Sequence, residues 1–133
     1  MKTSSLKYLL ILSVAAFLFS FTLIQEKWEV PAKYTSMKNP TDDDKESIQI
    51  GRQLYDKNCR SCHGKEGLGD GPKAGELETP TGDFTTAEFQ KQSDGAIFYK
   101  TTTGRGDMPE FAKKISSDED RWLIVRYIRT FAE

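Results

Sequence analysis

The sequence is poor in the residues that most metal and nucleic-acid sites require. Its 133 residues include one histidine and two cysteines, so a structural zinc site, which needs about four thiolate or imidazole ligands, lacks its second ligand pair. Lys and Arg number 19 against 20 Asp and Glu. Nucleic-acid binding calls for a basic face or stripe, so no nucleic-acid partner is expected. The sequence also lacks an internal repeat and a persuasive strand pattern.

One long uncharged run lies at the N-terminus. Lys2 and Lys7 precede 17 residues without a charge, Tyr8 to Ile24. This pattern is typical of an export segment. The run is longer than the usual core of a cleaved signal and at the lower limit for a bilayer-spanning helix. Residues 1–24 are therefore predicted to be either a signal peptide or an N-terminal membrane anchor. The protein is predicted to be exported to the periplasm, either soluble or anchored through residues 8–24.

Residues 25–40 are predicted to form a linker or an arm. Pro31 and Pro40 lie among mixed charges without a clear period, a composition typical of a tether. A few apolar residues give part of the segment something to dock with, and these are Trp28, Val30, Tyr34 and Met37. Residues 41–133 then remain for one domain.

Helical signals dominate that domain. A first helix is predicted from near Thr41, whose hydroxyl would cap it, to about Asn58. Its apolar face comprises Ile48, Gly51, Leu54 and Tyr55. A glycine inside a helix costs about 1 kcal/mol relative to alanine, and a close helix crossing at Gly51 would explain it. We therefore expect this helix to cross the last one.

The last helix has the strongest apolar signature. It is predicted to begin at Ser117 and to be apolar around most of its girth. The apolar residues are Trp122, Leu123, Ile124, Val125, Tyr127, Ile128 and Phe131. A shorter helix is predicted over Ser93 to Thr102, with Gly104 just beyond its end, whereas residues 64–92 are predicted to be mainly loop. The predicted fold class is all-α.

The only cysteines and the only histidine form the motif Cys59-Arg60-Ser61-Cys62-His63. This spacing is typical of c-type haem attachment: each thiol adds across a haem vinyl group, and the adjacent imidazole binds the iron. A thioredoxin-like dithiol would need a strand and helix framework that the pattern does not show. A plain disulfide between Cys59 and Cys62 remains an alternative, but it leaves His63 unexplained.

A second axial ligand is sought among three methionines, because the chain has no second histidine. Met1 lies in the export segment and Met37 in the arm. Met108 lies in the loop Gly104-Arg105-Gly106-Asp107-Met108-Pro109, where glycines allow a close approach to a flat ring. A lone methionine is more often core filler, but this polar loop is a poor core. Met108 is the predicted ligand.

Over Thr41 to Phe131 the chain resembles the monohaem class I c-type cytochromes, and more closely their compact bacterial forms. The matching features are Gly51, Tyr55, Cys59-x-x-Cys62-His63-Gly64, Gly69-Asp70-Gly71-Pro72, Gly104 to Pro109, Trp122 and Tyr127. The resemblance implies the cytochrome c fold, in which small helices wrap around one covalent haem c and the N- and C-terminal helices cross. It also implies that the carbonyl of Pro72 accepts a hydrogen bond from the second nitrogen of His63.

The expected function is electron transfer rather than catalysis. His63 and Met108 would hold the iron in a closed six-coordinate state, which suits a carrier between respiratory-chain partners outside the cytoplasm. Such partners dock transiently through small, charge-complementary interfaces. A haem subunit of a larger membrane oxidoreductase complex is the first alternative. A haem enzyme such as a peroxidase is the second, although it would need an open iron position and usually a distal acid or base.

Overall fold

The protein is seen in a computed structural model that describes residues 27–132. The described elements are α2 (Ala32–Thr35), α3 (Lys45–Asn58), α4 (Arg60–His63), η1 (Ala74–Glu76), α5 (Ala87–Gln90), α6 (Asp94–Thr103), η2 (Phe111–Lys113) and α7 (Asp118–Arg129). Within this range the structure contains no strand, only one isolated bridge between Arg105 and Met108. The all-α prediction is confirmed. The predicted signal peptide or anchor at residues 1–24 lies outside the described residues.

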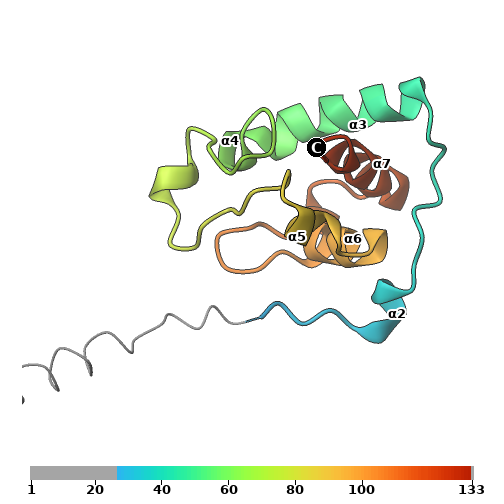
Figure 1. The fold of residues 1–133 in the computed structure, drawn as a ribbon, viewed down its shortest axis with the longest axis horizontal. Helices are drawn as coiled ribbons and strands as arrows, with labels where there is room; N and C mark the ends of the chain where they lie inside the picture. Colours follow the sequence, from blue (N-terminus) through green and yellow to red (C-terminus); the bar gives the residue numbers. More distant parts are fainter. Residues whose placement is uncertain (1–26, 133) are drawn as a thin grey trace, which may run out of the picture.

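The first and last long helices cross, as predicted. α3 packs against α7 more extensively than any other pair of described elements, and Figure 1 shows the two helices together on one side of the molecule. A Cβ on Gly51 would overlap the carbonyl oxygen of Leu123, and the carbonyl carbon would lie only 2.8 Å away. Only glycine permits this approach, so the cost of a glycine inside α3 is offset by close packing at the crossing.

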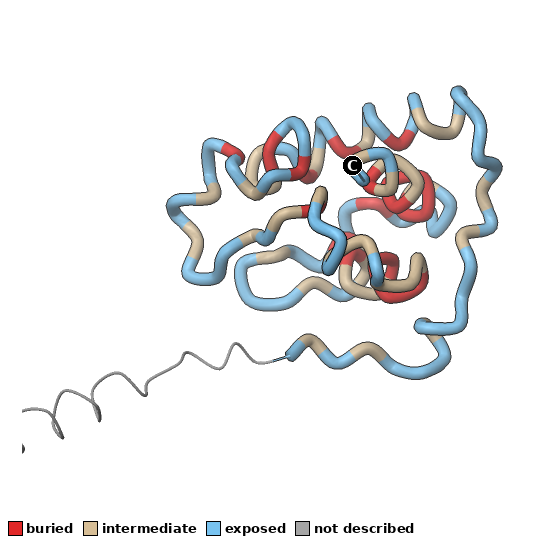
Figure 2. The backbone as a smooth tube through the Cα atoms, in the orientation of Figure 1, coloured by how far each residue is buried: buried red, intermediate tan, exposed pale blue. Residues whose placement is uncertain are grey.

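The core lies between α3, α6 and α7 (Figure 2). Tyr55 of α3 and Ile124 and Val125 of α7 are fully buried. Phe98 of α6 stacks on Trp122 with ring centroids 4.0 Å apart. The shorter helix predicted near Ser93 to Thr102 is confirmed as α6, with Ser93 as its N-cap and Gly104 as its C-cap. Its Ile97 and Phe98 are buried.

The predicted start of α3 was wrong by one turn. Asp44 is the N-cap, and its carboxylate accepts the N–H of Ser47 at 2.8 Å. The hydroxyl of Thr41, the predicted cap, donates instead to the side-chain oxygen of Asn39 at 2.7 Å. An N-cap aspartate accepts a free N–H group of the first turn, here that of Ser47, whereas the hydroxyl of Thr41 is already engaged with Asn39.

The segment before α3 packs along the outside of the helical core. In Figure 1 it runs past α6 as α2 and then extends toward the start of α3. The ring of Tyr34 lies 4.7 Å from that of Tyr99 on α6, and the side-chain amide of Asn39 donates to the carbonyl of Trp122 at 3.0 Å. The described part of the predicted arm is thus docked. Among the described residues, no helix has the length and apolar character needed to cross a bilayer.

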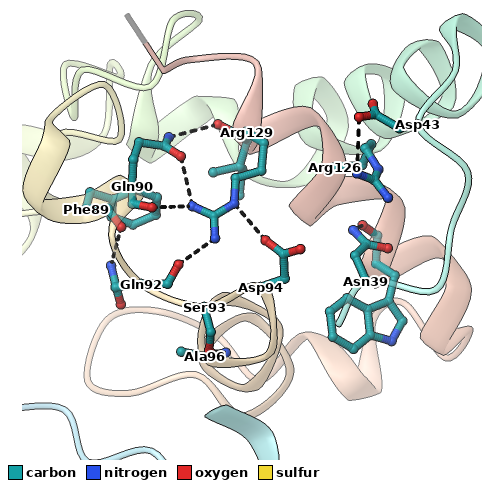
Figure 3. A network of polar contacts seen from close by, with 12 residues as sticks. Asn39, Asp43, Phe89, Gln90, Gln92, Ser93, Asp94, Ala96, Arg126 and Arg129 are labelled. Atoms are coloured by element: carbon teal, nitrogen blue, oxygen red, sulfur yellow. Dashed lines mark hydrogen bonds and ion pairs between the residues drawn. The ribbon is translucent and has the colours of Figure 1, made fainter. Parts of the chain in front are cut away.

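Arg129, near the end of α7, joins the last helix to α5 and α6 (Figure 3). Its guanidinium donates to the carboxylate of Asp94 at 2.7 Å and to the carbonyl and side-chain oxygens of Gln90, both at 2.9 Å. It also donates to the carbonyl of Gln92. The side chain of Gln90 in turn donates to the carbonyl of Phe84 at 2.7 Å. The polar network thereby fixes the loop that carries Phe84.

Replacing Gly51 by alanine tests the helix crossing. The added methyl group would press on the backbone of α7, which cannot rotate away. We expect G51A to lower the free energy of unfolding by about 1–3 kcal/mol, even though alanine is the better helix former. Thermal unfolding of the haem-loaded protein measures this. G75A is the matched control, because nothing lies within 4 Å of a Cβ there. Equal midpoints for G51A and G75A would contradict the account.

Candidate functional site

The three motif residues lie on one turn of chain at the end of α3. Cys59 is both the C-cap of α3 and the N-cap of α4. Its carbonyl accepts the N–H groups of Cys62 at 3.1 Å and His63 at 3.0 Å. Residues three and four apart on a helical turn lie on the same side. The structure therefore places both thiols and the imidazole together.

The loop that follows folds back and satisfies the carbonyl groups of this turn. The partners, in chain order, are Gly64 N–H on Arg60, Lys73 N–H on Ser61, Gly71 N–H on Cys62 and Gly69 N–H on His63, at 2.9, 2.9, 3.2 and 2.9 Å. The hydroxyl of Tyr55 donates to the carbonyl of Gly64 at 2.8 Å, within the core. A short helix leaves its last carbonyls unpaired unless other groups reach them. Here the loop and Tyr55 supply those groups, so the motif has one fixed backbone conformation.

His63 is presented as a neutral, oriented imidazole. Burial lowers the pKa of His63 to about 4, and the neutral form is the one that binds a metal. Its ring stacks on Phe84 with centroids 4.4 Å apart, and Phe84 stacks on Phe89 at 4.4 Å. Its Nδ1 atom is buried and has no hydrogen-bond partner among the described residues. The predicted bond from His63 to the carbonyl of Pro72 is thus absent from this structure, and the role of Pro72 stays a prediction.

The thiols do not suit a dithiol redox site. Cys59 and Cys62 are both unbridged. Burial, with a smaller contribution from Cys62, raises the pKa of Cys59 to about 12. Thiol–disulfide exchange depends on a thiolate, which a low pKa provides. Cys59 stays protonated at neutral pH, and this disfavours the thioredoxin-like alternative.

The loop that carries Met108 is a tight turn after α6. Arg105 and Met108 exchange N–H···O=C bonds, both at 3.0 Å. A Cβ on Gly104, which has a φ of 61°, would overlap the carbonyl oxygen of Met108. Met108 is half-buried and packs against the core cluster that contains Cys59 and Phe84. Met37, by contrast, is 39% exposed.

The described part of the chain offers no cluster of side chains for a separate metal ion. No group of three or more His, Cys, Asp and Glu side chains is arranged there to hold a metal ion.

Phe84, whose ring stacks on His63, was missed by the sequence prediction, because an isolated aromatic in a glycine-rich loop carries no pattern. Arg105, in the same loop as Met108, lies over the ring of Trp28.

Comparison with known proteins assigns the chain to a family. The family model described as "Cytochrome C oxidase, cbb3-type, subunit III" matches residues 46–128. The chain belongs to this family of c-type cytochromes. A cytochrome c domain implies haem c, and the donor set fits that group: two neighbouring thiols and one neutral imidazole, whose ring is held by the stack on Phe84.

A solved structure supports the same fold for this cytochrome. It is a chain of the reducing HAO-like protein complex of Kuenenia stuttgartiensis, with 31% sequence identity and a TM-score of 0.66. The match covers 82% of the cytochrome but only 53% of that chain, so the cytochrome spans about half of its relative. No curated protein matches the sequence.

The bond from Tyr55 to Gly64 provides a direct test of the motif's backbone support. Y55F removes the hydroxyl and leaves a buried carbonyl without a partner, which costs about 1–3 kcal/mol. We expect denaturant unfolding of the haem-loaded variant to show a loss in this range. Y127F, which removes a hydroxyl with no hydrogen bond among the described residues, is the control and should change stability by much less. A Y55F variant as stable as Y127F would refute this support.

Proposed function

We propose that this cytochrome carries electrons on a single haem c, attached through Cys59 and Cys62, with His63 and Met108 as axial ligands. The observation that carries the proposal is the fixed turn that presents two thiols and a neutral imidazole on one side. The family match supports haem-based electron transfer as the general role. Haem c, when bound, supplies reversible one-electron chemistry at its iron.

The chain's own residues favour a carrier over an enzyme. His63 is held neutral by burial and kept in place by Phe84. Met108 approaches the same core from a loop whose backbone is braced by its pairing with Arg105. Methionine paired with histidine raises the reduction potential relative to two histidines and closes the iron to substrates. With His63 engaged, the chain has no second histidine for distal acid–base work.

Two settings fit such a carrier. In the first, it shuttles between respiratory-chain proteins in the periplasm after export through residues 1–24. In the second, it is one subunit of a larger membrane oxidoreductase complex. The family description names an oxidase subunit, and the solved relative is a chain of a protein complex. Purification from native membranes in mild detergent distinguishes the settings, since a complex subunit elutes with other chains at high salt and a shuttle elutes alone.

Covalent attachment is tested by removing both thiols. The double variant C59A/C62A, made in a host with haem attachment machinery, should lose all covalent haem, because no other thiol exists in the chain. Mass spectrometry of the denatured protein measures the loss. S61A, in the same turn, should keep one haem per chain. A wild-type protein without covalent haem would disprove the proposal.

Axial ligation by Met108 is tested optically. M108A should open one iron position, so the reduced variant should bind carbon monoxide while the wild type resists it. Its reduction potential should also fall, because a thioether stabilises the ferrous state. M37L changes the exposed methionine of the arm and should behave as wild type. If M37L binds carbon monoxide and M108A does not, Met37 is the ligand and the assignment is wrong.

A further inference from the structure

Two side chains from the Met108 loop reach segments far away in the sequence. The guanidinium of Arg105 lies over the ring of Trp28, 4.6 Å from its centroid. The carboxylate of Asp107 accepts the N–H groups of Glu78 at 2.9 Å and Thr79 at 3.3 Å. The loop is thus held from two sides, by the N-terminal arm and by the loop after η1.

We propose that Trp28 and Asp107 are positioning residues that keep Met108 on the iron. The proposal rests on the proposed function, in which Met108 is an axial ligand. Residues 105–107 are exposed, and segments with few buried contacts open locally at low free-energy cost. Each opening would release a flexible thioether from the metal. Contacts that disfavour opening therefore strengthen the ligand bond without touching the iron.

The arm that carries Trp28 is attached to the core at two later points. Tyr34 packs on Tyr99, and the side-chain amide of Asn39 donates to the carbonyl of Trp122. The ammonium of Lys100 on α6 lies 5.6 Å from the centroid of the Trp28 ring. In Figure 1 the first described residues run along the loop that follows α6. The indole therefore lies between α6 and the loop, and an aromatic face attracts both cations.

Asp107 connects the Met108 loop to the side of the site that carries the histidine. It holds residues 78–79, and in the same loop the hydroxyl of Thr81 donates to the carbonyl of Gly69 at 3.0 Å. Gly69 donates its own N–H to the carbonyl of His63 at 2.9 Å. The charged carboxylate of Asp107 forms stronger hydrogen bonds with these two amide groups than a neutral acceptor would. One series of hydrogen bonds thus links the two ligand-bearing segments.

The strength of the methionine bond can be measured by competition. Free imidazole, titrated into the ferric haem-loaded protein, binds iron only when Met108 leaves it. We expect W28A and D107A each to raise the apparent imidazole affinity by about three- to tenfold. W28A removes the cation–π contact with Arg105, and D107A removes the two hydrogen bonds to Glu78 and Thr79. W28F keeps an aromatic face and D107N keeps one acceptor oxygen, so both should restore most of the wild-type resistance.

A destabilised comparator separates a local effect from a global one. G51A serves as this comparator, because a Cβ at Gly51 meets Leu123 and Tyr127 of α7, neither of which lies in the Met108 loop. It should lower global stability and leave imidazole affinity unchanged. The proposal is overturned if G51A raises affinity as much as W28A and D107A, or if W28A and D107A match wild type while M108A does not. A wild type that binds imidazole as readily as M108A would instead overturn Met108 ligation, and this inference with it.

Discussion

The site depends on the pairing of five consecutive backbone carbonyls, from Arg60 to Gly64, with donors that lie outside the turn or at its end. A four-residue helix has almost no stability of its own. It persists here because the following loop reverses and covers its carbonyl end, and because Tyr55 closes the last position from α3. The same arrangement ties the motif to the helix crossing, since Tyr55 packs beside Tyr127 of α7 at 5.3 Å. The packing of the core and the geometry of the site therefore depend on the same residue, Tyr55.

Much of the fold was predictable because its signals are local. Helices α6 and α7 begin directly after Ser93 and Ser117, the residues at which the two helices were predicted to start, and the glycine inside α3 marks the crossing with α7. The start of α3 was misplaced because Thr41 and Asp44 are both good caps, and only the contact of Thr41 with Asn39 decides between them. Local sequence cannot reveal that competition.

The candidate site likewise has a part that local sequence predicts and a part that it does not. The adjacency of Cys59, Cys62 and His63 follows from their spacing on one turn, so sequence alone could place them together. The stack of Phe84 on His63 could not be predicted, because it is set by contacts between distant segments. The same is true of Asp107, whose amide partners lie about thirty residues earlier. Loop contacts of long sequence separation leave no periodic signal.

The Arg129 network also bears on when the middle of the chain can acquire its shape. One guanidinium on α7 binds the carbonyls of Gln90 and Gln92 and the carboxylate of Asp94, all of which lie at least 35 residues earlier in the chain. The segment that supports Phe84, and with it the face of the imidazole, therefore acquires its shape only once α7 has docked. Assembly of the centre is in this way coupled to a contact of long sequence separation.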